Sequence, residues 1–168
     1  MSLDGFIADK EGGFDWITGD KNKTNDTKKQ FDFPKFIDSI DTIVMGKTAY
    51  LDCPSGTFEE FKSHKIYVAS NEKLESKYDN VKFINGNIVK QILDLKKEKG
   101  KDIWLFGGGK LADAFIKAEV IDEYIIGIIP VILGKGIQLF LDNNPKLELN
   151  LQEYTVQEGI IISRYSKR

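Results

Sequence analysis

Residues 104–112 have the sequence Trp104-Leu105-Phe106-Gly107-Gly108-Gly109-Lys110-Leu111-Ala112. The apolar run 102–106 (DIWLF) is typical of a buried strand. After the glycines we expect a helix whose inward face carries Leu111, Phe115 and Ala118. Glycines allow a backbone to approach a bulky anion, and the first turn of a helix offers unpaired N–H groups. A plain strand-to-helix turn needs only one glycine, so the triplet favours an anion-binding site.

The rest of the chain repeats this alternation of strand and helix. The expected strands are 42–46, 65–70, 81–84, 122–132, 147–156 and 159–165, and the expected helices are 34–40 and a segment between Asn87 and Gly100. Strands that alternate with helices favour a largely parallel sheet with helices on both faces. The last two strands join at Glu158-Gly159 as an antiparallel hairpin, which makes the sheet mixed. We therefore predict an α/β fold.

Length and composition indicate one globular domain, residues 1–168. Hydrophobic residues make up 41% and charged residues 30% of the chain, which is unlike the composition of disordered proteins. A net charge of -2 predicts neither a nucleic-acid partner nor a membrane partner. The longest apolar run, 124–133, contains Pro130 and is too short to span a bilayer. The first residues are not basic-then-apolar as in a secretory leader, so we expect a cytoplasmic protein.

Cysteine and histidine each occur once, as Cys53 and His64. One cysteine excludes an intramolecular disulfide, and the two residues together are too few for a structural metal centre, so no metal is predicted. His64 lies in the polar stretch 62–65 and is expected to be a solvated loop residue. Cys53 has no base partner in the sequence around it and is expected to be inert.

Two further strand ends carry residues that suit an anion. Met45-Gly46-Lys47-Thr48 follows a strand, but it is not a P-loop, because Asp41 stands where that motif needs glycine. Gly46 and Lys47 remain suited to a phosphate, with Lys47 as a point charge, although a capped turn explains them nearly as well. Ser70-Asn71 ends the next strand and alone indicates only a turn. Open α/β sheets bind ligands at the carboxyl ends of their strands, so the three strand ends together predict a site for an extended dinucleotide.

Four motifs span nearly the whole chain: Ser2-Leu3-Asp4-Gly5-Phe6-Ile7-Ala8, Thr42-Ile43-Val44-Met45-Gly46, Phe106-Gly107-Gly108-Gly109 and Pro130-Val131-Ile132-Leu133-Gly134-Lys135-Gly136. In sequence and order they resemble the riboflavin-biosynthesis reductase (RibD C-terminal) family, and PVILGKG is the most specific of them. The resemblance implies the three-layer fold of dihydrofolate reductase, with a mixed, mostly parallel central sheet. It also implies NADPH-dependent hydride transfer to a pyrimidine- or pteridine-like substrate. Members usually have a strand before the SLDG motif, so we expect that the start is truncated or that this strand is missing.

The resemblance also implies which residues contact NADPH. Ile7 and Ala8 would flank the nicotinamide, and Gly107 to Gly109 would hold the pyrophosphate. Lys47, Ser70 and Asn71 would bind the 2′-phosphate, which favours NADPH over NADH. The full set of implied cofactor-binding residues is Ile7, Ala8, Gly46, Lys47, Thr48, Ser70, Asn71, Phe106, Gly107, Gly108, Gly109, Lys110 and Leu111.

The substrate side follows from the same resemblance. Dihydrofolate reductases use a carboxylate at the start of a helix, four residues before a phenylalanine, and Asp32 and Phe36 have this spacing. Asp32 would hold or protonate the substrate as the catalytic residue, and Phe36 would pack on its ring. A helix N-cap explains Asp32 equally well, since Pro34 follows two residues later. Trp16 matches an aromatic of the loop over the substrate, and an aromatic lid on the core is the alternative for it.

Three functions remain open at this point. The first is an NADPH-dependent reductase of the RibD C-terminal type, and the second is a true dihydrofolate reductase, which Asp32 and Phe36 favour and PVILGKG disfavours. The third is a nucleotide-binding module without catalysis. Related reductases are commonly dimers, so the resemblance also implies a homodimer.

Overall fold

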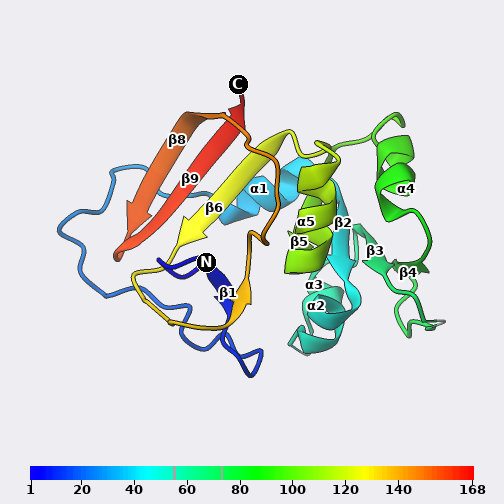
Figure 1. Ribbon diagram of the computed structural model, residues 1–168, viewed down its shortest axis with the longest axis horizontal. Helices are drawn as coiled ribbons and strands as arrows, with labels where there is room; N and C mark the ends of the chain where they lie inside the picture. The colour runs from blue at the N-terminus through cyan, green and yellow to red at the C-terminus, as the bar shows by residue number, and fades with distance from the viewer. Residues whose placement is uncertain (55, 73) are drawn as a thin grey trace. The chain divides into compact units, whose positions relative to one another are not determined.

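The computed structural model describes residues 1–54, 56–72 and 74–168 (Figure 1). Contacts within the chain divide it into two compact units. The central unit is Phe33–Val120, and the terminal unit combines Met1–Asp32 with Ile121–Arg168. Of the sheets in the described residues, the central unit contains one and the terminal unit contains two.

The central unit contains a parallel four-stranded sheet in the order β4-β3-β2-β5. Its strands are β2 (Ile40–Gly46), β3 (Lys65–Ala69), β4 (Val81–Ile84) and β5 (Asp102–Gly107). Their sequences are nearly continuous runs of apolar residues, because both faces of a parallel sheet are covered. In register, Gly46 lies opposite Ala69 on one side, and Met45 lies opposite Gly107 on the other. The carboxyl ends of β2, β3 and β5, which carry the residues suited to an anion, therefore lie at one edge of this sheet, as predicted.

The described helices of the central unit are α1 (Phe33–Ser39), α2 (Lys47–Asp52), α3 (Thr57–Glu60), α4 (Ile88–Leu95) and α5 (Gly109–Lys117). Helices α2, α3 and α4 connect the strands, whereas α1 precedes β2 and α5 follows β5. The helix after Asn87 is confirmed, and the Asn87 side chain accepts the N–H of Lys90 at 3.0 Å. The inward face of α5 differs from the prediction, because Ala118 is exposed and Ala112, Phe115 and Ile116 are buried. The helix ends at Lys117, so Ala118 is its C-cap and leaves the face that packs inward.

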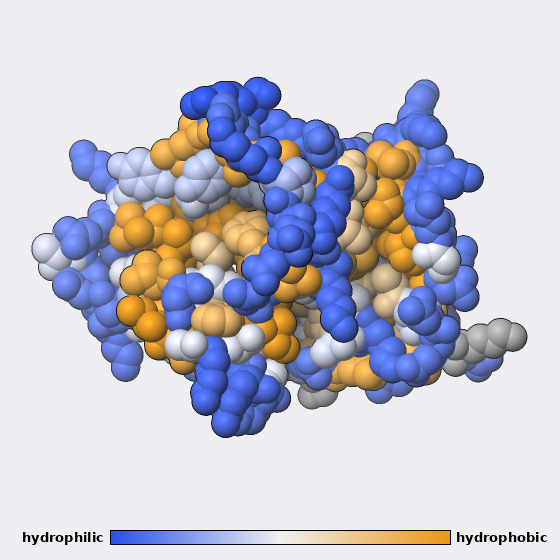
Figure 2. Space-filling view, viewed as in Figure 1, coloured by the Kyte–Doolittle hydropathy of each residue, from blue (hydrophilic) through white to orange (hydrophobic). Residues whose placement is uncertain are grey.

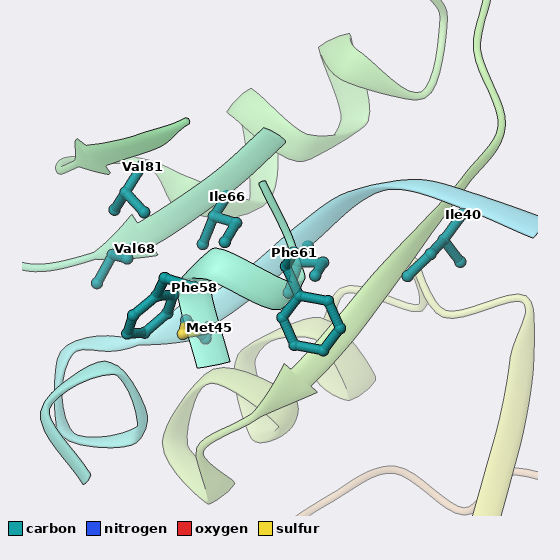
Figure 3. Packing of buried hydrophobic residues seen from close by; sticks show 8 residues of the cluster. Ile40, Met45, Phe58, Phe61, Ile66, Val68 and Val81 are labelled. Carbon is teal, nitrogen blue, oxygen red and sulfur yellow. The ribbon is translucent and has the colours of Figure 1, made fainter. Parts of the chain in front are cut away.

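The core of the central unit lies against one face of its sheet. Figure 3 shows Phe58 and Phe61, from and just after α3, beside Met45, Ile66 and Val68 of the strands. Because side chains alternate along a strand, the fully buried Val44 points to the opposite face. The step from β4 to β5 runs back across β3 and β2, and a right-handed crossover places α4 on that second face. Helices therefore cover both faces, as predicted.

His64 belongs to this core, and the prediction of a solvated loop residue is wrong. Its side chain is buried, its Nε2 lies 3.3 Å from the carbonyl oxygen of Ile37, and its ring meets that of Phe61 edge-on. The Asn80 side chain donates to the carbonyl oxygens of Phe61 and His64 and closes the turn around them. The polar residues next to His64 in the sequence do not predict its burial. The residues that cover it, in α1 and around Asn80, are distant from it in the sequence.

The terminal unit contains an antiparallel sheet in the order β6-β9-β8, built from β6 (Glu123–Ile128), β9 (Ile160–Lys167) and β8 (Leu149–Gln157). Glu158 and Gly159 both have positive φ, 49° and 79°, and form the predicted hairpin turn. A two-stranded pair joins β1 (Phe6–Ala8) to β7 (Ile137–Gln138). The expected strand 122–132 is shorter than predicted and ends at Ile128, since Pro130 cannot continue the ladder.

One face of the antiparallel sheet carries apolar side chains at the surface. The register puts Leu151, Tyr154 and Ile161 on the same face, and each is at least 40% exposed. Figure 2 shows hydrophobic surface in the region of these strands. Among the helices that the structure describes, none has the length and apolarity needed to cross a membrane.

Candidate functional site

The carboxyl ends of β2 and β5 form the centre of the site. The chain runs from β2 to β3 and β4 on one side and then returns to β5 on the other, so the topological switch lies between β2 and β5. Open α/β sheets bind ligands in the crevice at such a point. Gly46 ends β2 here, and a Cβ on Gly108 would lie 3.8 Å from both the Cα and the N of Gly46. The two glycine turns therefore lie side by side at this switch point. The place where they meet, at which such sheets bind their ligands, is called the crevice below.

The backbone of this crevice requires glycine at one position in particular. Gly108 has φ of 101°, a left-handed conformation that an L side chain rarely adopts. α5 begins at the next residue, and the N–H groups of Leu111 and Ala112 both donate to the carbonyl oxygen of Gly108. A Cβ on Gly46 would meet nothing within 4 Å, so the space beside the turn is open. Open space beside a glycine turn, close to the start of a helix, suits the pyrophosphate of a dinucleotide.

Lys47 lies beside this crevice as the first residue of α2. Its Nζ is 2.6 Å from Oε1 of Glu72, a residue that the prediction did not include. Ser70 is buried, and its hydroxyl accepts the N–H of Glu72 at 3.1 Å and lies 3.3 Å from the Glu72 carbonyl oxygen. The signal that could have identified Glu72 is an acidic residue just after a strand that ends at the predicted dinucleotide site.

The other predicted cofactor residues of the central unit differ in their surroundings. Thr48, Asn71 and Lys110 are exposed, and Leu111 is half-buried. Phe106 packs against the core, with its ring 4.9 Å from that of Trp104. Its backbone is displaced, because Leu105 pairs with Val44 while Gly107 pairs with Met45, which leaves Phe106 as an extra residue in β5. This bulge aligns Gly107 with Met45, next to Gly46.

Ile7 and Ala8 lie in β1 of the terminal unit, where the PVILGKG segment holds the SLDG turn. The Asp4 carboxylate accepts hydrogen bonds from the Ser2 hydroxyl at 2.7 Å and from the N–H groups of Leu133 and Gly134 at 3.1 and 2.7 Å. A Cβ on Gly136 would overlap the carbonyl oxygen of Ala8. The two most specific motifs of the sequence therefore form one contact that positions β1.

We expect Asp4→Asn to destabilise the fold in a pH-dependent way. The hydrogen bonds from Ser2, Gly134 and Leu133 lower the pKa of the Asp4 carboxyl, so its stabilising effect is present above its ordinary pKa of 3.8. The effect is lost as the pH falls through the lowered pKa of the folded state. An asparagine would place an N–H donor against the N–H of a loop residue. Urea midpoints across the acidic range measure this, with the exposed Asp142→Asn as control. A wild-type advantage that does not shrink in acid would contradict it.

Trp16 lies in a loop that the β8–β9 hairpin anchors. The Asp9 carboxylate accepts the N–H groups of Glu11 and Gly13, and the Trp16 ring N–H donates to the Gly13 carbonyl at 3.1 Å. The hairpin turn then fixes the rest of the loop, since Glu158 accepts the N–H of Asp20 and donates its own N–H to Asp26. The Trp16 side chain is half-buried, and both interpretations of its role remain predictions.

Asp32 is the last residue of the Met1–Asp32 segment, and Phe36 belongs to α1 of the central unit. Asp32 is exposed and directly precedes α1, the position of an N-cap. Phe36 is half-buried in an aromatic cluster, with its ring 5.1 Å from that of Trp104 and nearly perpendicular to it. Phe36 therefore has a packing role in the core, and its contact with a substrate remains a prediction.

Elsewhere, burial raises the pKa of the Cys53 thiol, which disfavours its reactive thiolate form.

Comparison with known proteins identifies several relatives. Two proteins of Bacillus subtilis (strain 168) are similar: the uncharacterized protein YyaP is 33% identical over 175 residues, covering 96% of this chain and 88% of its own length. YwjB, also uncharacterized, is 34% identical over 152 residues, covering 89% of this chain and 84% of its own length.

Solved structures share the fold. A putative riboflavin biosynthesis protein from Shewanella sp. PV-4 matches with a TM-score of 0.80 and 28% identity, over 100% of this chain and 95% of that one. A diaminohydroxyphosphoribosylaminopyrimidine deaminase/5-amino-6-(5-phosphoribosylamino)uracil reductase from Thermotoga maritima matches with a TM-score of 0.68 and 14% identity. The match spans 99% of this chain and 54% of the Thermotoga protein. The RibD C-terminal domain family matches residues 1–161. The chain therefore belongs to the RibD C-terminal domain family and has its dihydrofolate reductase-like fold.

Proposed function

We propose that this protein is an NADPH-dependent reductase that transfers hydride to a small pyrimidine- or pteridine-like substrate. The observation that carries the proposal is the close approach of the Gly46 and Gly108 turns at the switch point of a parallel sheet. Membership of the RibD C-terminal domain family supports it, as does the reductase activity named for the Thermotoga relative.

In this proposal the chain positions a cofactor and a substrate. The turn at Gly107 to Gly109 and the start of α5 hold the pyrophosphate, and Lys47 binds a phosphate as a point charge. Ile7 and Ala8 flank the nicotinamide. NADPH supplies the hydride when it is bound. Asp32 holds the substrate and assists its protonation, which is the step that the protein itself must provide.

The spacing of Asp32 and Phe36 keeps a second candidate, a true dihydrofolate reductase. Tight binding of methotrexate together with turnover of dihydrofolate would favour it. Turnover of 5-amino-6-(5-phosphoribosylamino)uracil without methotrexate binding would favour the first proposal.

Titration with nicotinamide cofactors tests the cofactor site directly. We expect NADPH to bind in the micromolar range and more tightly than NADH, because Lys47 adds an attraction for the 2′-phosphate. Quenching of tryptophan fluorescence and the nicotinamide emission both measure the binding. If neither NADPH nor NADH binds, the proposed function is wrong.

Two expectations from the sequence belong to the same proposal. A homodimer is the assembly that the family resemblance implies, and sedimentation of the purified protein measures it. A cytoplasmic location suits an enzyme that uses NADPH, and fractionation of the host cell tests it.

A further inference from the structure

The ion pair between Lys47 and Glu72 occupies the side chain that would bind the 2′-phosphate. The two charged atoms are 2.6 Å apart, and the side chains are 33% and 64% exposed, respectively. Ser70 holds the backbone of Glu72 through its hydroxyl, which places Glu72 at the end of β3, the strand next to β2. Lys47 is therefore neutralised by a carboxylate at the proposed cofactor site.

A carboxylate at this place has opposite effects on the two nicotinamide cofactors. It competes with the negatively charged 2′-phosphate of NADPH for the Lys47 ammonium group. It also accepts a hydrogen bond from a free ribose 2′-hydroxyl, as acidic residues do in other dinucleotide sites. Glu72 is largely exposed, so its side chain can leave Lys47 when a phosphate takes its place.

We propose that Glu72 sets the cofactor preference of this protein by competing with the 2′-phosphate for Lys47. The inference rests on the proposed function and names a specificity-determining residue of the same site. It follows that the wild-type protein prefers NADPH only moderately and accepts NADH.

The test compares Kd values for Glu72→Gln and for a matched control. Glu98→Gln removes the same charge from the segment that precedes β5, at the opposite edge of the parallel sheet. We expect Glu72→Gln to tighten NADPH binding roughly three- to tenfold without improving NADH binding, and Glu98→Gln to change neither by more than about twofold. Adenosine 2′,5′-bisphosphate and adenosine 5′-monophosphate repeat the comparison on fragments that differ only in the 2′-phosphate.

A second variant shows whether the effect acts through Lys47. In a Lys47→Met background we expect Glu72→Gln to change the NADPH Kd by less than about twofold, because there is no ammonium group left to compete for. A gain that persists without Lys47, or an equal gain in Glu98→Gln, would overturn the role of Glu72 and leave the cofactor site intact. Failure of the wild-type protein to bind either cofactor would instead reject the proposed function, and the role of Glu72 with it.

Discussion

Asp32→Asn is expected to lower turnover at least a hundredfold while the NADPH Kd stays within about twofold of the wild-type value. The carboxyl group is the acid that the proposed reaction needs, and asparagine cannot transfer a proton. Asparagine is as good an N-cap as aspartate, so the substitution preserves a capping role at the start of α1. The variant thus separates the two interpretations of Asp32, which directly precedes α1 in the structure.

The measurement is the loss of NADPH absorbance with 5-amino-6-(5-phosphoribosylamino)uracil or with dihydrofolate. Asp38→Asn, an exposed substitution on the same helix, is the matched control and should keep wild-type turnover. Full activity in Asp32→Asn would assign Asp32 to capping alone. Binding of NADPH without turnover of any heterocycle by the wild-type protein would favour the non-catalytic nucleotide-binding module.

Gly108→Ala should raise the NADPH Kd roughly tenfold to a hundredfold, because it removes close contact between the glycine turn and the pyrophosphate. An alanine at φ of 101° strains the backbone, and its methyl group occupies space beside Gly46, 3.8 Å from the Gly46 Cα and N atoms. The expected loss corresponds to one or two charge-assisted hydrogen bonds.

Gly86→Ala provides the control for strain alone. Gly86 also has positive φ, 76°, and a Cβ there would meet nothing within 4 Å. It follows β4, which is the far strand of the order β4-β3-β2-β5 from the crevice. Both variants should lose about 1 kcal/mol of unfolding free energy, and only Gly108→Ala should lose NADPH affinity. Thermal unfolding and cofactor titration measure the two effects separately. Equal cofactor loss in both variants would reject the crevice as the binding site.

The strands of the central unit were predictable because their signals are local. Runs such as 42–46 and 81–84 are apolar and end in turn residues, and this pattern needs no knowledge of distant contacts. The glycine triplet and the Glu158-Gly159 turn were equally visible, since few residues adopt the backbone conformations required there. The order of the motifs was sufficient to indicate the family.

Several features of the site depend on residues that are far apart in the sequence. Glu72 lies 25 positions after Lys47, and its carboxylate reaches the lysine only because β3 pairs beside β2. Asp4 accepts hydrogen bonds from Leu133 and Gly134, about 130 positions away, and the sequence alone showed only that Asp4 belongs to the SLDG motif. No local pattern predicts such pairs.

The local sequence thus determined the strands, the glycine turns and the edge of the sheet at which Gly46, Ser70 and Gly107 lie. The tertiary structure decided which charges meet at that edge, where the strand before Pro130 ends, and that His64 is buried instead of solvated. The physical reason is that backbone conformation follows from neighbouring residues, whereas burial and ion pairing follow from segments that come together only when the sheet forms.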